Sequence, residues 1–238
     1  MEAILLRQVA YGDNDRVLTL LTDREGKVSV LARGARTSKK RFEGGALEPF
    51  GVIDAEIVLG NAELGRLVSA RLTRGFPRLL GSLERMEQAG AGLELVRELV
   101  PFREADPRLL SAITELLEQL NEEDAGLEVR LGFELRFLSL VGLCPRLDTC
   151  GRCGRFAEHR AGLFDADIGA LVCRACGGGP IHLGGRTRAR MIACQGDDWA
   201  AQTHGWSDVE RHEAREAIEA FLRKQLGKAR HHERWNER

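Results

Sequence analysis

Residues 3–35 read AILLRQVAYGDNDRVLTLLTDREGKVSVLARGA and set the fold of the N-terminal part of the chain. The stretch holds three short runs of aliphatic and β-branched residues, and residues that favour turns stand between them. YGDND separates the first two runs, and DREG, which is typical of a tight hairpin connection, separates the second from the third. The pattern therefore predicts three consecutive β-strands.

Two further runs extend this pattern, FGVIDAEIV at 50–58 and GRLVSARL at 65–72. Five short strands with no long helical segment between them favour a small closed barrel, because closure removes exposed strand edges. We therefore predict a five-stranded OB-fold β-barrel that binds nucleic acid over residues 1–79.

After about residue 81 the apolar residues recur at helical spacing. The last helix is expected to start at a capping box formed by Ser207 and Glu210 and to end at Gly227. The helical patterns predict an α-helical bundle domain in two parts, residues 80–143 and 181–238. The predicted fold class is therefore α+β multidomain.

Four of the six cysteines form two Cys-x-x-Cys pairs with 19 residues between the pairs. Two residues between cysteines let both thiolates reach one metal from a tight turn, and the full spacing fits a tetrahedral zinc site. Four thiolates leave no open coordination position, so we expect one structural Zn²⁺. The predicted zinc-finger insertion spans residues 144–180, with Cys150, Cys153, Cys173 and Cys176 as ligands.

Other readings of the cysteines remain open. A redox dithiol would need only one Cys-x-x-Cys pair and a thioredoxin-like context, which the sequence lacks, and an iron–sulfur cluster is a further alternative. Cys144 and Cys194 fall outside the pattern, and we expect Cys144 to be a core thiol. His159 and His182 lie near the pairs and are read as surface residues rather than ligands.

The segment RGARTSKKR at 33–41 concentrates positive charge without any acidic residue. Its ordinary reading is a solvated loop. It joins two strands of a predicted OB barrel, however, and such loops commonly bind single strands. Cations on a flexible loop neutralise phosphates and release counterions, which favours binding of any sequence. The predicted DNA-binding residues are Arg33, Arg36, Lys39, Lys40 and Arg41.

Few aromatic residues accompany these cations. Residues 1–80 contain only Tyr11, Phe42, Phe50 and Phe76, whereas typical single-strand binders stack bases on aromatic rings. Electrostatic attraction is therefore expected to dominate, with salt-sensitive, sequence-independent binding of single and double strands. Five arginines can extend the cationic surface, with strand alternation dividing them between faces: Arg7, Arg16, Arg66, Arg71 and Arg74.

The composition is that of a folded soluble protein with a formal net charge of −1. The charge is uneven, because Lys+Arg against Asp+Glu is 13 to 10 in residues 1–80, 6 to 13 in 81–143 and 16 to 13 in 144–238. No apolar run is long enough to cross a bilayer, and the start of the chain lacks the features of a signal peptide. We expect a cytoplasmic protein without membrane contact.

The order of these parts resembles the RecO family of bacterial recombination mediators. AILLRQVAYGDNDRVLTLLTDREGKVSVLARGAR resembles the opening strands of that family, and FEGGALEPF resembles its passage into the fourth strand. FELRFLSLVGLCPRLDTCGRCG resembles its entry into the zinc finger. The resemblance spans most of the chain and is most specific at residues 3–50 and 131–178.

The resemblance implies a non-enzymatic role in recombinational DNA repair. Proteins of this kind bind single- and double-stranded DNA, anneal complementary strands, and work with RecR and RecF. They help RecA to replace single-stranded-DNA-binding protein. The segment at 33–41 matches the DNA-binding face of the family in position and character.

Three other classes of protein are alternatives to a recombination mediator. A nucleic-acid ligase would need a nucleotidyltransferase domain, for which the chain has no room, and the sequence has no Walker A, GxSxG or HExxH motif. An RNA-binding or transcription-type adaptor would combine the same barrel with a zinc ribbon. A protein-interaction scaffold would use the basic loop to bind an acidic partner.

Overall fold

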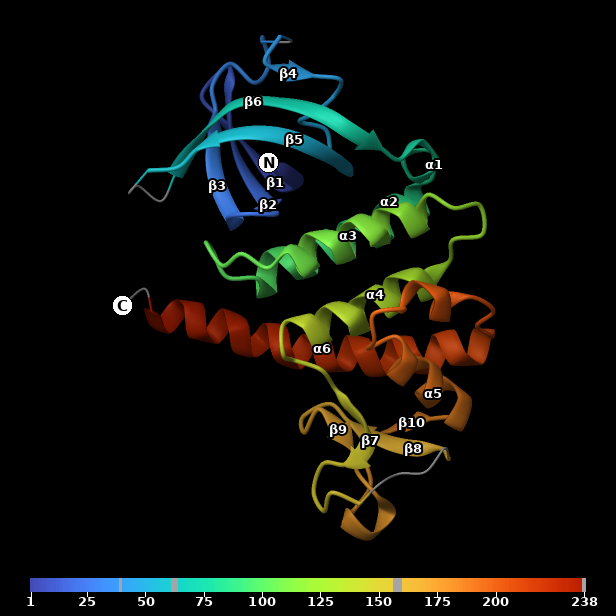
Figure 1. Ribbon diagram of the computed structural model, residues 1–238. Coiled ribbons are helices and arrows are strands. Elements are labelled where there is room, and N and C mark those ends of the chain that lie inside the picture. The colour runs from blue at the N-terminus through green and yellow to red at the C-terminus, as the bar shows by residue number, and fades with distance from the viewer. Residues whose placement is uncertain (39, 61–63, 156–159, 237–238) are drawn as a thin grey trace. The chain divides into compact units, whose positions relative to one another are not determined.

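The computed structural model describes residues 1–38, 40–60, 64–155 and 160–236, with side chains described up to residue 227 (Figure 1). The chain forms two compact units, Met1–Asp124 and Ala125–Arg238. The barrel and three helices make up the first unit, and three further helices and a small sheet make up the second. The division into four domains that the sequence suggests stays a prediction.

The first unit opens with a closed five-stranded barrel, as the sequence predicts. Its strands are β1 (Glu2–Tyr11), β2 (Asp15–Thr22), β3 (Gly26–Ala32), β5 (Gly51–Val58) and β6 (Leu64–Gly75). Antiparallel pairing joins β3, β2, β1, β5 and β6 in that order, and parallel pairing of β3 with β6 closes the barrel. A two-residue strand, β4 (Phe42–Glu43), adds to the edge of β6.

Strand alternation fills the barrel interior with small and branched apolar side chains. Leu18, Leu20, Val28 and Val30 are fully buried there, because successive residues of a strand face opposite sides of the sheet. A β-bulge near Leu6 shifts the pairing of β1 with β2 by one residue and separates a buried lower half of β1 from an exposed upper half.

The barrel also carries a buried outer face. Ile4 lies opposite both Leu21 and Val52 in the strand register, so all three side chains point to the same side of the sheet. They are at most 1 % exposed yet do not belong to the interior cluster. Figure 1 shows α2 and α3 lying along this side of the barrel, after the short α1. The helices are α1 (Pro77–Leu80), α2 (Leu83–Leu99) and α3 (Pro107–Leu120).

Backbone and polar contacts bind the helical layer to the barrel. Lys27 of β3 is buried, its Nζ donates to the Arg97 carbonyl at 2.6 Å, and it lies 4.4 Å from the centre of the Phe102 ring. The N–H of Arg103 donates to the Lys27 carbonyl at 2.9 Å. The first unit therefore extends beyond the barrel that the sequence pattern delimits.

The second unit combines helices with a four-stranded sheet. The helices are α4 (Leu127–Leu140), α5 (Gly185–Ala193) and α6 (Asp208–Asn236). The sheet has the order β10 (Ile181–Leu183), β8 (Gly162–Asp165), β9 (Ala170–Leu171) and β7 (Arg146–Cys150). Aromatic rings anchor its core, with Phe133 stacked on Phe137 and Phe164 edge-on to Phe221.

The boundaries of α6 correct one expectation. The predicted capping box is present, since the Ser207 N–H donates to the Glu210 carboxylate at 2.7 Å. The helix does not end at Gly227, however, and continues to Asn236. A glycine inside a helix costs only about 1 kcal/mol, and Lys228, Ala229 and Arg230 after it favour helix.

Across the described residues, none of the helices combines the length and the apolar character needed to span a bilayer.

Candidate nucleic-acid interface and metal centre

The described residues of the basic segment, 33–38 and 40–41, form a loop that is hydrogen-bonded to the hairpin between β1 and β2. The N–H of Gly34 donates to the Asp15 carboxylate at 2.7 Å, and the N–H of Arg36 donates to the Asn14 carbonyl at 3.3 Å. Gly34 has a φ of 61°, a conformation that glycine adopts without strain. The loop therefore has a defined shape rather than a free path between strands.

Arg41 differs from the other cations of this loop. Its Nη2 donates to the Arg33 carbonyl at 2.6 Å, its Nε donates to Ser38 Oγ at 3.0 Å, and its guanidinium lies 5.3 Å from the centre of the Phe42 ring. Arg41 therefore helps to hold the loop closed as well as carrying charge.

The four predicted cations that the structure describes all lie on the surface. Arg33, Arg36, Lys40 and Arg41 are all exposed, and none of the four forms an ion pair with a carboxylate of the described residues. Arg36 makes one side-chain bond, from Nη1 to the Asp13 carbonyl at 3.3 Å. Lys39, the fifth predicted residue, lies outside the described part of the chain. Unpaired exposed cations keep their full attraction for phosphate groups.

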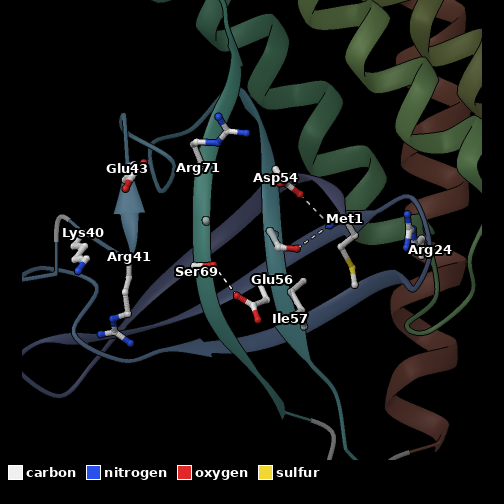
Figure 2. Close-up of a pocket in the computed structure, with 12 residues that line it drawn as sticks. Met1, Arg24, Lys40, Arg41, Glu43, Asp54, Glu56, Ile57, Ser69 and Arg71 are labelled. Carbon is white, nitrogen blue, oxygen red and sulfur yellow. Dashed lines mark hydrogen bonds and ion pairs between the residues drawn. The ribbon is translucent and has the colours of Figure 1, made fainter.

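A groove of about 520 Å³ runs from this loop over the outer side of β5 and β6 (Figure 2). Lys40 and Arg41 line one side, Arg24 stands on the other side, and Arg71 projects from β6 between them. The groove also contains carboxylates, so it is not a purely cationic pocket.

Two of those carboxylates already have partners. Asp54 accepts from the N-terminal ammonium of Met1 at 3.0 Å, and Glu56 accepts from Ser69 Oγ at 3.1 Å. The hydrogen bond from the ammonium group, together with its charge, lowers the pKa of Asp54, and Arg71 adds to the effect. The groove therefore combines cations with acidic groups: the ammonium group balances the charge of Asp54, and Arg24 lies 3.6 Å from the Asp23 carboxylate.

The other arginines that the sequence set apart have divided roles. Arg7 and Arg66 are exposed on the barrel. Arg74 is ion-paired with Glu118 of α3, and Arg16 donates to Gln8 at 2.5 Å. Of these five arginines, only Arg71 lines the groove.

The aromatic residues of the barrel differ in their exposure, and Phe50, which the sequence suggests is a core residue, is only partly buried. Phe42 and Phe76 are buried, whereas Tyr11 is 58 % exposed at the end of β1. Tyr11 lies opposite Asp15, the residue that fastens the basic loop. The signal available in the sequence was its place beside the turn GDND, where a hairpin ends.

The four predicted zinc ligands come together in the second unit. Their sulfur atoms all lie within 4.8 Å of one another. Parallel pairing places Cys150, the last residue of β7, opposite Leu171 of β9, two residues before Cys173. Gly154 and Gly177 follow the two pairs with φ of 68° and 105°, which lets each short segment turn back on itself.

The local hydrogen bonds favour a thiolate at Cys150 and a protonated thiol at Cys176. The N–H of Cys173 donates to Cys150 Sγ at 3.4 Å. Backbone N–H groups of Cys173, Cys153 and Arg152 lower the pKa of the Cys150 thiol to about 6, whereas hydrogen bonds with Cys173 and Cys153 raise the pKa of Cys176 to about 12. Four adjacent thiols cannot all ionise by themselves, because each thiolate opposes the next. A bound cation removes that penalty, since metal-coordinating thiols lose their protons.

The spacing of the sulfurs fits a tetrahedral ion. A Zn–S bond of about 2.3 Å places the sulfurs of a tetrahedral site about 3.8 Å apart. Cys153 Sγ and Cys173 Sγ are 3.8 Å apart. The four sulfurs therefore lie close enough together that they could hold one metal ion.

The two other cysteines of the chain differ in exposure. Cys194 is fully buried, but Cys144 is exposed, so the expectation of a core thiol at Cys144 is wrong. It follows the end of α4, where the chain turns at Gly142 with a φ of 75° and leaves the helical core. His182 is exposed and its Nδ1 lies 3.2 Å from Glu213. His159 lies outside the described residues.

A closed five-stranded barrel with an exposed cationic loop, followed by a helical unit, defines an OB-type barrel protein with a four-cysteine cluster that could hold a metal ion. The family model described as "Recombination protein O N terminal" matches residues 1–76, and "Recombination protein O C terminal" matches residues 80–234. The chain therefore belongs to the RecO family, which gives it a role in DNA repair.

Individual relatives agree with this assignment, and each is named DNA repair protein RecO. The relative from Anaeromyxobacter sp. (strain K) is 40% identical over 233 residues, covering 96% of this chain and 91% of the relative. The relative from Myxococcus xanthus is 39% identical over 74% of this chain and 71% of its own length. The relative from Pelobacter propionicus is 36% identical over 82% of this chain and 78% of its own length.

Proposed function

We propose that this chain is a DNA-binding recombination mediator that holds single- and double-stranded DNA on its barrel and anneals complementary strands. The observation that carries the proposal is the folded loop 33–41, whose exposed cations have no carboxylate partner among the described residues. Such cations bind phosphates without reading sequence. The proposed role is non-enzymatic. The protein would act in the cytoplasm, on the DNA of the nucleoid.

The proposed annealing mechanism follows from where the charges lie. Two DNA strands repel each other, and cations placed between them screen that repulsion. The loop stands between the groove lined by Arg71 and the hairpin that carries Tyr11, so DNA can be held on both sides of it. Contacts to the phosphate backbone leave the base edges free, so that the held strands can still pair.

The proposed metal is one structural Zn²⁺ held by Cys150, Cys153, Cys173 and Cys176. This identity is supported by the four-sulfur donor set and by the spacing of the sulfurs. Bound zinc would tie β7 to the turn after β9 and stabilise the small sheet. In this proposal it takes no part in chemistry, because four thiolates fill its coordination sphere.

The proposed partners follow from family membership. The chain would act with RecR and RecF and would help RecA to replace single-stranded-DNA-binding protein on single-stranded DNA.

The test is annealing of complementary, fluorescently labelled oligonucleotides by the wild type and by the double variant Arg36→Glu/Lys40→Glu. Both side chains are exposed, so the fold should persist, and Arg41 is left in place because it closes the loop. We expect the variant to bind DNA about tenfold more weakly near 100 mM salt and to lose annealing in parallel. The dependence of the binding constant on salt should also become shallower.

The matched control is Arg215→Glu/Arg223→Glu, which makes the same change of net charge at exposed positions of α6. If only the loop variant loses binding and annealing, the loop is the DNA-binding site. Full annealing by the loop variant would overturn the proposal. Equal competition by RNA of the same length would favour the RNA-binding adaptor, and absence of any nucleic-acid binding at low salt would favour the scaffold.

A further inference from the structure

The upper half of the barrel has an outer face with exposed apolar side chains. Below the bulge, this side of β1 and β2 is buried at Ile4 and Leu21. Above it, the register places Val9, Val17 and Leu31 in one row across three strands. Val9 is 47 % exposed, and the other two are partly exposed. Tyr11 continues the row of Val9 along β1.

We call this set of four residues, Val9, Tyr11, Val17 and Leu31, the upper sheet face. It is apolar and contiguous across β1, β2 and β3, and it ends in an aromatic ring. Tyr11 makes no described aromatic or cation–π contact, and the chain contains no other tyrosine. A ring that is more than half exposed offers one flat side to a partner.

Cations frame the upper sheet face. Arg7 precedes Val9 by two positions on β1, and Arg66 of β6 lies opposite Leu31 in the parallel register. Arg36 reaches the hairpin at the Asp13 carbonyl, close to Tyr11 in the chain. All three side chains are exposed. Two acids are also near: Asp13 at the tip, and Asp15, whose carboxylate is already bonded to the Gly34 N–H.

We propose that the upper sheet face binds the unpaired bases of single-stranded DNA, with one base stacked on Tyr11. The inference rests on the proposed function and deepens it, since it separates single strands from duplexes at the same barrel. Phosphates would be held by Arg7, Arg66 and the loop, while bases would cover the apolar residues. Paired bases cannot reach the ring, because their flat faces are stacked inside the duplex.

Nucleic acid is the occupant favoured by this combination of groups. An apolar strip alone would suit an apolar peptide, and cations alone would suit any polyanion. A polymer that alternates flat apolar rings with a negative charge at each step matches both, and base–aromatic stacking tolerates every sequence. An acidic peptide remains an outcome that the test distinguishes.

The experiment measures binding of two oligonucleotides of about 20 nucleotides by fluorescence anisotropy. One is oligo(dT), and the other has the same sugar–phosphate chain with abasic sites in place of bases. The proteins are the wild type, Tyr11→Ala and Tyr11→Phe, each full length and measured across a salt series. Because the probes carry equal charge, any difference between them reports the bases.

We expect the wild type to prefer oligo(dT), and Tyr11→Ala to lose about tenfold in affinity for it, which corresponds to ~1.4 kcal/mol at 25 °C. Affinity for the abasic probe and the salt dependence of binding should stay unchanged in Tyr11→Ala. Tyr11→Phe keeps the ring and should match the wild type. Photocrosslinking of a 5-iodouracil-containing strand should label Tyr11.

Two failures are distinguishable. If the wild type binds both probes and Tyr11→Ala binds them equally well, the inference about the upper sheet face is overturned while the proposed DNA binding stands. The same holds if the wild type does not distinguish the two probes, which is the result expected of a face for acidic peptides. If the wild type binds neither probe at low salt, both the inference and the proposed function fail.

Discussion

Glu134 on α4 is a buried carboxyl group with an arginine beside it. It is 3 % exposed, its Oε1 lies 3.4 Å from Arg130 Nη1, and its Oε2 has no hydrogen-bond partner among the described residues. Burial raises the pKa of this carboxyl to about 7; Arg130 opposes the shift and Glu219 adds to it. A charged carboxylate is costly in such a place unless fully paired.

This pKa predicts a pH dependence of stability. In the unfolded chain the carboxyl loses its proton near pH 4.5, but in the folded chain it keeps the proton up to about pH 7. The folded state binds more protons in this window, so the contribution of Glu134 to the free energy of unfolding falls as pH rises from about 4.5 to 7. The variant Glu134→Gln should lack that fall, and urea unfolding at pH 5 and pH 8 measures it.

The control for this prediction is Glu219→Gln, which keeps the buried carboxyl and removes an exposed neighbour. It should retain a pH dependence, with a smaller amplitude than the wild type. Identical pH dependence in the wild type and in Glu134→Gln would contradict the prediction.

At the scale of elements, the turns between strands are set by what surrounds them as well as by their backbone angles. Gly12 in the β1–β2 turn and Gly26 at the start of β3 have nearly the same φ, 63° and 64°. A Cβ at Gly12 would meet nothing within 4 Å, whereas a Cβ at Gly26 would lie 2.0 Å from the Glu104 carbonyl oxygen. The segment between α2 and α3 therefore presses on the second turn.

The two glycines form a matched pair for mutation. Gly12→Ala should cost about 1 kcal/mol in free energy of unfolding, from backbone strain alone. Gly26→Ala should cost more than ~3 kcal/mol, because the segment at Glu104 must also move. Urea unfolding of both variants gives the comparison. Equal losses would mean that the contact with Glu104 yields without cost.

A second prediction at the scale of elements concerns the four-cysteine cluster. Replacing one ligand, as in Cys153→Ser, should lower the zinc content of the purified protein from about one ion per chain to well below it. Loss of the ion should also speed trypsin cleavage at the neighbouring exposed residues Arg152 and Arg155. Release of zinc to a chromogenic chelator measures the first effect, and a proteolysis time course measures the second.

Cys144→Ser serves as the control, because Cys144 is exposed and does not belong to the cluster. It should keep full zinc content and the trypsin resistance of the wild type. Full zinc retention in Cys153→Ser would argue against a four-thiolate site.

At the scale of the whole molecule, the first compact unit ends at Asp124, well beyond the barrel. The reason is the buried outer face at Ile4, Leu21 and Val52, which needs α2 and α3 to exclude water. Apolar side chains of this size gain about 1.5–3 kcal/mol each from full burial. A barrel cut off at residue 79 would expose them.

This arrangement predicts how fragments behave. The fragment Met1–Asp124 should fold and unfold cooperatively on heating, as followed by circular dichroism. The fragment 1–79 should bind a hydrophobic dye and show no cooperative transition, because its outer face has lost its cover. Cooperative unfolding of fragment 1–79 would instead support the shorter barrel domain that the strand pattern suggests.

Several features could be predicted from the sequence because their signals are local. Strand alternation and turn residues predicted the five barrel strands, the Cys-x-x-Cys spacing predicted the cluster, and Ser207 with Glu210 predicted the start of α6. Each depends on residues a few positions apart. The predicted end of α6 at Gly227 was wrong for the same reason. A single glycine does not end a helix reliably when strong helix formers follow it.

The sequence by itself determined that the chain is a closed barrel followed by helices with a four-cysteine cluster, because hydrophobic period, turn chemistry and cysteine spacing depend on neighbouring residues. Only the tertiary structure decided which side chains share a face. In the folded chain Tyr11 is exposed, Phe42 is buried, and the basic loop is hydrogen-bonded to Asp15. The exposure and the contacts of a side chain depend on segments that are distant in sequence and pack together. A local sequence pattern therefore does not predict them.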